Sequence, residues 1–297
     1  MEWITSIKKS INYMESHLLD EISIEDVAKH VNISSFYLQK GFQLITGVSM
    51  SEYIRKRRLY MAALDLMSGD EKIIEIAFKY GYETPESFTK AFTRFHGITP
   101  SGLKSEKTAI KTFLPLKISL LIQGGNEMDY VVEKMKGFKV IGYERVFTFD
   151  NGYENIPKFW SEIFQEKMTS IFKKEKPETE EEETIVNCRI GEFGICIDDV
   201  GENGKFRYMI AGIYTEGKVP DGMVVYEIPE LEWAKFKCVG PIPGAIQSVN
   251  TNIFKEWLPG NDSYEIAMGL NLEWYSSDGN PTDSDYESGI WLPVKRK

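Results

Sequence analysis

Cysteine, histidine and long apolar runs are scarce in this chain of 297 residues. The three cysteines, Cys188, Cys196 and Cys238, are too few and too widely spaced for a disulfide framework or a zinc site. All three histidines precede residue 97, so the later part of the chain lacks a histidine-dependent catalytic group. No run of about 18 apolar residues and no signal segment occurs. We therefore expect a cytoplasmic protein without a disulfide, metal, cofactor or membrane span.

Two copies of one helical pattern occupy the first hundred residues. The first copy runs from residue 24 to Gly47 and the second from residue 73 to Gly97, and in each a polar or glycine break separates two helices. The first helices carry a small residue, Ala28 or Ala77, where the second helix must cross closely. The expected N-caps are Ser23, Ser34 and Thr84 before Pro85. The pattern predicts two helix-turn-helix units that can enter a major groove, although a single such pair also occurs in proteins that never bind DNA.

Residues 49–67, which join the two copies, contain no proline or glycine and read as one helix. Its ~19 residues would span ~28 Å, close to the ~34 Å between successive major-groove faces on one side of B-DNA. A single chain could therefore hold two recognition helices on neighbouring groove segments without a dimer partner. The basic run from Arg55 to Arg58 covers all sides of one turn, so part of it should face phosphate and part should pair with carboxylates.

The matching motifs are Tyr37-Leu38-Gln39-Lys40, Thr46-Gly47, Tyr53-Ile54-Arg55, Ile76-Ala77, Gly81-Tyr82 and Gly97-Ile98-Thr99-Pro100. On these motifs, residues 24–104 resemble the DNA-binding domain of the AraC/XylS family, in particular its Rob-like subgroup, where this domain comes first. The resemblance implies an all-α double helix-turn-helix domain over residues 1–107, with double-stranded DNA as partner and RNA polymerase as a further one. It places the DNA contacts at Ser35, Phe36, Gln39, Lys40, Arg55, Thr84, Glu86, Lys90 and Arg94.

This chain departs from the family at three of those positions. Lys40 and Lys90 stand where family members often carry arginine, so a bidentate guanine contact becomes a single-point contact. Glu86 stands where relatives often carry glutamine, and a carboxylate accepts from cytosine but repels phosphate. We therefore expect a target sequence different from those of other family members.

The distribution of charge along the chain indicates two domains with different functions. Residues 1–117 hold 16 Lys and Arg against 14 Asp and Glu, whereas the remaining residues hold 19 against 31. The net charge of the first part is only slightly positive, so its basic side chains should gather on one face. The acidic remainder should stay away from a duplex.

From residue 116 onward the apolar residues change from helical spacing to alternation. Strands are expected around 139–143, 194–197, 208–214 and 289–294, and helices around 156–172 and 245–258. A similar order of strand, helix and strands begins near residue 133 and again near residue 226. This pattern predicts an α+β domain built from a duplicated unit, with a cleft along its pseudo-twofold seam. We expect residues 108–128 to form a linker and first strand, and residues 129–297 to form the second domain.

Residues 264–275, read as one strand, present two different faces. One face is bulky and apolar, whereas the other combines small residues with Glu273 and Tyr275. A carboxylate among aromatic rings suits an organic cation, held by charge pairing and cation–π contact. The pattern alone favours a simpler interpretation, in which Glu273 faces solvent from an edge strand.

The second domain has motifs of its own, Pro229, Trp233-Ala234-Lys235-Phe236, Leu272-Glu273-Trp274-Tyr275 and Ile290-Trp291-Leu292-Pro293. On these motifs it resembles the GyrI-like effector-binding domain, which also occurs in multidrug-responsive regulators. The resemblance implies an antiparallel sheet, a central cleft and a buried pocket glutamate at Glu273. The expected ligand-binding residues are Glu273, Tyr275, Trp160, Tyr208, Tyr226, Trp233 and Trp291. Gly289 stands where relatives often carry glutamate, which should remove a charge near the mouth.

Together the two resemblances imply a one-component transcriptional regulator and not an enzyme. Its promoter binding would be modulated by a small cationic or amphipathic effector, with coupling through residues 105–114. The alternative is a GyrI-like hydrolase that acts on a reactive small molecule with Glu273 as general base. A third hypothesis is that the second domain binds a protein partner.

Overall fold

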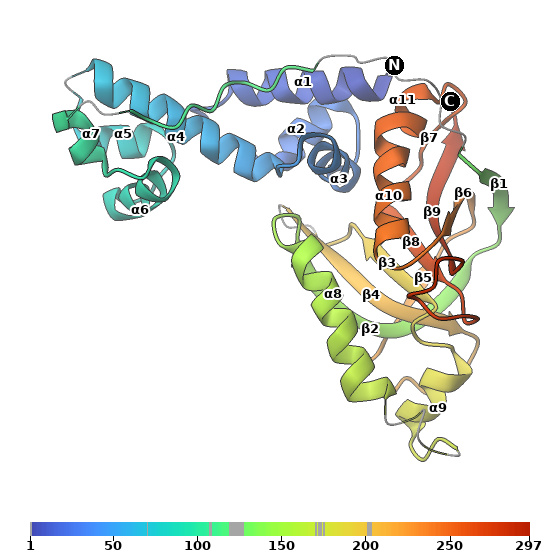
Figure 1. Cartoon of the computed structure of the whole chain (residues 1–297). Helices are drawn as coiled ribbons and strands as arrows, with labels where there is room; N and C mark the ends of the chain where they lie inside the picture. Colours follow the sequence, from blue (N-terminus) through green and yellow to red (C-terminus); the bar gives the residue numbers. More distant parts are fainter. Residues whose placement is uncertain are drawn as a thin grey trace. The chain divides into compact units, whose positions relative to one another are not determined.

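Helices make up the first part of the chain in the computed structural model, and an antiparallel sheet dominates the second part (Figure 1). The structure describes residues 2–69, 71–106, 109–118, 128–169, 171, 174, 176–200 and 204–297. Contacts divide the chain into a first unit, Glu2–Gln123, and a second unit, Gly124–Lys297. Within those described ranges, no helix is both long and apolar enough to cross a membrane.

The helices of the first unit are α1 (Glu2–Ser16), α2 (Ile24–Val31), α3 (Ser35–Thr46), α4 (Met50–Ser68), α5 (Ile73–Lys79), α6 (Pro85–His96) and α7 (Pro100–Glu106). The two predicted helix-turn-helix units are α2–α3 and α5–α6, and α4 is the predicted connecting helix. Helices α1 and α7 were not predicted. The signal for α1 was present, since Trp3, Ile7, Ile11 and Met14 have helical spacing and are all buried.

Local signals set the ends of these helices. The side chains of Ser23, Ser34 and Thr84 each accept a hydrogen bond from a backbone N–H in the first turn, which confirms the three predicted N-caps. Helices α3 and α6 end at Gly47 and Gly97, whose φ angles of 77° and 82° lie in the left-handed region that glycine tolerates. Both second helices are therefore 12 residues long, with the same start and stop chemistry.

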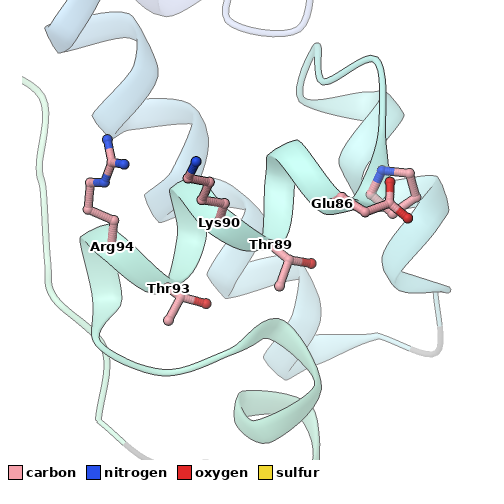
Figure 2. A pocket seen from close by; sticks show the side chains of 6 residues that line it. Glu86, Thr89, Lys90, Thr93 and Arg94 are labelled. Carbon is pink, nitrogen blue, oxygen red and sulfur yellow. The ribbon is translucent and has the colours of Figure 1, made fainter.

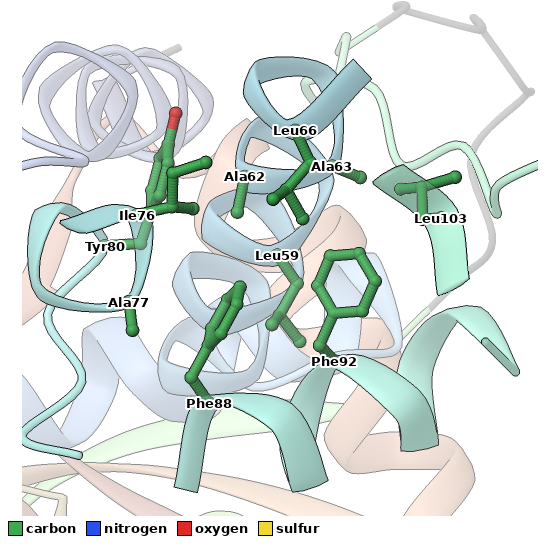
Figure 3. Packing of buried hydrophobic residues seen from close by; sticks show 10 residues of the cluster. All are labelled: Leu59, Ala62, Ala63, Leu66, Ile76, Ala77, Tyr80, Phe88, Phe92 and Leu103. Atoms are coloured by element: carbon green, nitrogen blue, oxygen red, sulfur yellow. The ribbon is translucent and has the colours of Figure 1, made fainter. Parts of the chain in front are cut away.

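Helices α4, α5 and α6 share one apolar core with α7 (Figure 3). Figure 3 shows Phe88 and Phe92 of α6 pointing towards Leu59 of α4. Ala77 of α5 is fully buried in this core, as expected for a position where helices cross closely. One side of α6 is thereby fixed in the core, which determines the side that remains exposed.

Residues 109–118 form neither helix nor strand, and they run along α4 (Figure 1). The backbone oxygen of Phe113 accepts a hydrogen bond from Arg57 of α4, and the backbone N–H of Leu116 donates to the hydroxyl of Tyr53. The expected first strand is absent from these residues, and residues 119–127 lie outside the described part of the chain. The described part of the linker thus packs as an element of the first unit.

The strands of the second unit are β1 (Tyr130–Met135), β2 (Phe138–Thr148), β3 (Phe193–Ile197), β4 (Lys205–Tyr214), β5 (Val224–Ile228), β6 (Leu231–Val239), β7 (Tyr264–Ile266), β8 (Leu270–Tyr275) and β9 (Glu287–Arg296). They pair antiparallel in the order β1-β6-β9-β8-β3-β4-β2-β5, with β7 also on β9. The helices are α8 (Gly152–Ile163), α9 (Glu180–Asn187), α10 (Gly244–Asn252) and α11 (Leu258–Gly260). The π-helical turns η1 (Phe164–Met168) and η3 (Ile253–Trp257) follow α8 and α10.

Two strands, a helical segment and further strands follow one another twice in this unit, as the predicted duplication requires: β1–β2, α8–α9 and β3–β4, then β5–β6, α10–α11 and β7–β9. The central pair β3–β8 joins the two repeats. Strands β1 and β2 of the first repeat exchange partners with β6 and β5 of the second. The predicted α+β class and antiparallel sheet are confirmed, whereas the central cleft stays a prediction.

Alternation along the strands gives the sheet two faces. The apolar face carries a buried cluster of Val140, Phe193, Ile195, Ile197, Met209, Ala211, Ile228, Trp233, Leu270 and Leu272. Met135 of β1 and Ile228 of β5, from opposite ends of the strand order, both pack in this cluster, so the sheet curves around it. The other face, here called the helix face, packs against α8 and η3, where Phe159 meets Phe147 and Trp257 meets Phe236.

Residues 264–275 form two strands rather than the predicted single one. Strand β7 ends at Ile266, β8 begins at Leu270, and both pair with β9. Gly269 lies in the break, where an added Cβ would come within 2.6 Å of the Cβ of Asp198. The predicted alternation survives within β8, because Leu270 and Leu272 join the apolar cluster and Glu273 points to the helix face.

Candidate functional site

The outer side of α6 is a strip of polar side chains. A shallow, open depression on it is lined by Pro85, Glu86, Thr89, Lys90, Thr93 and Arg94 (Figure 2). Lys90 and Arg94 lie one turn apart, both exposed, and no acidic side chain in the described part of the chain forms an ion pair with either of them. The N-cap Thr84 is also exposed. The capped start and one full side of α6 are therefore open to a partner.

The first copy of the motif presents its second helix differently. Phe36, Gln39 and Lys40 of α3 are buried, with only 4% of Gln39 and 8% of Lys40 exposed, and Ser35 is half-buried. The ammonium of Lys40 lies 5.7 Å from the centre of the Phe36 ring. A base-reading role for these side chains stays a prediction.

The basic run on α4 divides between surface and interior. Arg55 is exposed. Arg57 is buried and donates from Nε and Nη2 to the carboxylate of Glu15 in α1, at 2.8 and 2.9 Å. Arg58 donates from Nε to the backbone oxygen of Leu18 at 2.7 Å. Arg57 and Arg58 therefore stabilise the fold, and Arg55 is the arginine of the run that remains for a phosphate contact.

The helix face of the sheet carries a carboxylate surrounded by aromatic groups. Glu273 lies directly opposite Gly194 in the β3–β8 pair. Its Oε2 accepts hydrogen bonds from the hydroxyls of Tyr208 at 2.9 Å and Tyr275 at 3.0 Å. The indole of Trp160 in α8 donates to the Tyr208 hydroxyl at 2.9 Å, and its ring meets that of Tyr275 edge-on at 5.2 Å. Four of the seven predicted ligand residues thus form one group, here called the Glu273 cluster.

Gly194 makes the space that the Glu273 cluster occupies. A Cβ atom at this position would overlap the Tyr208 hydroxyl and lie 3.0 Å from Oε2 of Glu273. Glycine inside a strand often marks such a close approach. A glycine inside the predicted strand 194–197 was the available signal, but no role of Gly194 was predicted from it.

The electrostatics of the cluster leave the carboxylate without a cation. Burial, and then the negative charge of Glu273, raise the pKa of Tyr208 and of Tyr275 well above the ordinary value, so both hydroxyls stay protonated donors. The same two causes raise the pKa of the Cys238 thiol to about 12. No lysine or arginine among the described residues forms an ion pair with Glu273. A half-buried carboxylate is thus held by neutral donors on one oxygen.

The other three predicted ligand residues lie on the apolar face, away from the Glu273 cluster, and a ligand contact at these positions stays a prediction. Trp233 is fully buried in the apolar cluster, and Tyr226 and Trp291 pack against it. Gly289 also lies on this face, where an added Cβ would come within 3.1 Å of the backbone oxygen of Phe236 and would approach Trp291 and Trp274. Strand alternation decides these cases, since neighbouring residues on a strand point to opposite faces. In the described residues, no group of His, Cys, Asp and Glu side chains could hold a metal ion.

Each of the two units matches a known protein family. The family model described as integron-associated effector binding protein matches residues 132–294, and the helix-turn-helix domain model matches residues 27–106. The HTH-type transcriptional regulator YbfP of Bacillus subtilis (strain 168) is 34% identical over 154 residues, which are 52% of this chain and 48% of YbfP. The chain therefore spans about half the length of YbfP.

Two further proteins are similar to parts of this chain. The HTH-type transcriptional activator AarP of Providencia stuartii is 33% identical over 111 residues, which are 37% of this chain and 82% of AarP. The solved structure of SAV2435 bound to tetraphenylphosphonium is 21% identical with a TM-score of 0.45, and the match covers 57% of this chain and 94% of that one.

Proposed function

We propose that this chain is a transcriptional regulator whose promoter binding responds to a small molecule. The chain belongs to the family of integron-associated effector-binding proteins, and an AraC-type helix-turn-helix domain precedes the region that matches this family. YbfP and AarP are transcriptional regulators by name, and neither name points to hydrolysis. We favour binding without turnover over the hydrolase alternative, and we place the protein in the cytoplasm, where it would meet DNA and RNA polymerase.

The DNA-binding part of the proposal depends on the exposed side of α6. Lys90 and Arg94 offer positive charge to phosphates and guanine edges, and hydroxyls such as that of Thr89 can donate or accept. Glu86 near the start of the helix can accept from the amino group of cytosine. Arg55 adds a phosphate contact from α4. This combination of basic, hydroxyl and carboxylate groups on one side of a capped helix is typical of a recognition helix.

We assign the second reading surface to α3, through Ser35, Gln39 and Lys40. Helix α4 has 19 residues, which at ~1.5 Å per residue gives ~28 Å between its ends. That length suits two neighbouring major-groove segments. A single chain would then bind two half-sites without a dimer partner.

The effector part of the proposal depends on Glu273. A half-buried carboxylate without a basic partner favours a ligand that brings a positive charge. The ring of Trp160 and the two tyrosine rings provide aromatic surface for the same ligand, by cation–π contact. We therefore propose an organic cation with apolar groups as the effector. Coupling to DNA binding would pass through residues 105–114, and it requires the ligand to bind two states of the chain with different affinity.

Selection of duplexes from a random pool by the full chain tests the DNA-binding part. Fluorescence anisotropy at fixed salt then compares the selected duplex with a scrambled one. Lys90→Ala should weaken binding to the selected duplex about tenfold, as loss of a base contact does, and binding to the scrambled duplex far less. Lys8→Ala, an exposed lysine of α1 outside the α6 surface, is the matched control. Equal losses on both duplexes would contradict base reading.

Titration with tetraphenylphosphonium and with neutral triphenylphosphine oxide tests the effector part. Tryptophan fluorescence and calorimetry should show binding of the cation and at least about tenfold weaker binding of the neutral compound, because one charge contact is lost. Equal affinity for both, or for neither, would contradict a cation site. A hydrolysable cationic ester recovered intact by mass spectrometry separates binding from turnover.

A further inference from the structure

Residues 110–116 contact both ends of the first unit as they run along α4 (Figure 1). Ile110 packs against the core that α4 shares with α5 and α6. The Phe113 ring lies 6.4 Å from Phe95 of α6 and 5.8 Å from Tyr53, near the start of α4. At the end of the segment, the Leu116 N–H donates to the Tyr53 hydroxyl at 3.3 Å. The segment therefore passes from the second helix-turn-helix unit towards the first.

A buried network attaches this segment to α1 and α4. Arg57 is 5% exposed; its Nε and Nη2 donate to Glu15 of α1, and its Nη1 donates to the backbone oxygen of Phe113 at 2.5 Å. The Tyr53 hydroxyl donates to Glu15 at 2.7 Å while it accepts from Leu116. Burial, and then the hydrogen bond to Glu15, raise the pKa of Tyr53, which keeps this donor protonated. A buried network whose members are satisfied makes the parts that it joins rigid.

A fixed spacing between the two recognition helices requires a rigid connection between the two helix-turn-helix units. Besides residues 110–116, helix α4 connects the α2–α3 unit to the α5–α6 unit, with short turns at its two ends. A chain whose two units can turn independently loses part of its two-site affinity, because binding must then restrict that motion. A second connection along α4 reduces this loss.

We infer that residues 110–116 are a brace that holds the two helix-turn-helix units at the spacing required for two neighbouring major-groove segments. Phe113 and Tyr53 are its positioning residues: neither contacts DNA, and both act through α4. This inference rests on the proposed DNA-binding function and adds an element outside the helix-turn-helix units on which two-site binding depends.

Three duplexes test the brace with the full-length chain: the duplex selected by the wild type, the same duplex with one half-site scrambled, and the same duplex with two base pairs inserted between half-sites. Phe113→Ala should reduce affinity for the selected duplex about tenfold and remove the penalty for the insertion. Its affinity for the single half-site should stay within about twofold of the wild type. Phe113→Tyr keeps the ring and should restore wild-type behaviour.

Two results with these duplexes would overturn the brace. One is a Phe113→Ala chain that keeps the wild-type preference for spacing. The other is an equal loss on the single half-site, which would indicate general unfolding of the unit rather than lost positioning. Tyr53→Phe gives a second, milder variant, because it keeps the ring and removes only the bridging hydroxyl. About a threefold loss of two-site affinity is expected from it and none from the control Tyr60→Phe on the same helix.

Hydrogen exchange without DNA tests the brace independently. In the wild type the amide of Leu116, which donates to the Tyr53 hydroxyl, should be protected, and Tyr53→Phe should make it exchange at least about tenfold faster. Exchange at the rate of an unstructured chain in the wild type would overturn the brace. Failure of the wild type to select any duplex would instead overturn the proposed function, and the exchange data distinguish the two failures because they involve no DNA.

Discussion

Glu15 and Glu273 both accept hydrogen bonds from tyrosine hydroxyls, and these two carboxylates differ in what balances their charge. Glu15 in the first unit accepts from Tyr53 and also pairs with Arg57. Glu273 in the second unit accepts from two tyrosines and, among the described residues, pairs with no basic side chain. The charge of a partly buried carboxylate is neutralised by an arginine that pairs with it, whereas a carboxylate with only neutral donors retains an unbalanced charge. This difference supports a structural role for Glu15 and the proposed ligand contact for Glu273.

The largest expected effect is on the Glu15 side of this comparison. Arg57→Met leaves Glu15 without a cation and should reduce the free energy of unfolding of the first unit by about 3 kcal/mol, the order found when one partner of a buried pair is removed. Urea unfolding followed by the helical circular-dichroism signal measures it. Glu15→Gln combined with Arg57→Met should cost less than the sum of the single changes. A loss below about 1 kcal/mol would contradict the structural role.

The matching change on the other side is Glu273→Gln. It should weaken binding of tetraphenylphosphonium at least about tenfold, which is about 1.4 kcal/mol, because the charge contact is removed. The free energy of unfolding should change by less than about 0.5 kcal/mol, since no buried cation loses its partner. Fluorescence titration and urea unfolding of the same sample measure both. If the affinity for tetraphenylphosphonium were unchanged and the free energy of unfolding fell by several kcal/mol, Glu273 would have the same structural role as Glu15, and the proposed difference between the two carboxylates would be wrong.

A smaller effect is expected from Gly194→Ala. The new Cβ would displace the Tyr208 hydroxyl from Glu273, so the affinity for tetraphenylphosphonium should fall about threefold to tenfold while the charge of Glu273 remains. Gly244→Ala is the matched control, because a Cβ at Gly244 meets open space. Wild-type affinity in Gly194→Ala would show that the orientation of the carboxylate does not matter for binding.

The smallest effect is a pH dependence of the first unit. Burial lowers the pKa of His96 below its ordinary 6.5, while its Nε2 lies 3.1 Å from the backbone oxygen of Leu59. The folded unit therefore prefers neutral His96. Its contribution to stability is fully present above pH 6.5 and is lost as the pH falls through the folded-state pKa.

Urea unfolding at a series of pH values measures this effect, and His96→Gln should reduce the slope between pH 6.5 and 5. An identical slope in both proteins would assign the pH dependence to other groups. The second unit contains no histidine, so a histidine-dependent slope belongs to the first unit alone.

Much of the first unit could be predicted because its signals are local. Ser34 with Gly47, and Thr84 with Gly97, fix the ends of α3 and α6 through contacts within a few residues. The AraC-type and GyrI-like resemblances, carried by short motifs, are confirmed by the two family matches. The exposure of Arg55 and the burial of Arg57 could not be predicted, because a four-residue basic run covers every side of a helical turn.

The candidate site of the second unit could be predicted only in part. Glu273 and Tyr275 share a face because they are two residues apart on one strand. Trp291 was assigned to the same site on composition, but it pairs with Leu272 and so lies on the opposite face. Gly194 leaves space for the Glu273 cluster only because the strand register places it opposite Glu273, and this register is not visible in the sequence.

The sequence by itself determined the elements, their caps and the alternation within each strand, since these depend on neighbours along the chain. The tertiary structure alone decided which aromatic residues surround Glu273, which arginines turn inward and where residues 110–116 lie. Those outcomes depend on register and packing between segments far apart in the sequence, and a shift of one residue in one strand would exchange its two faces.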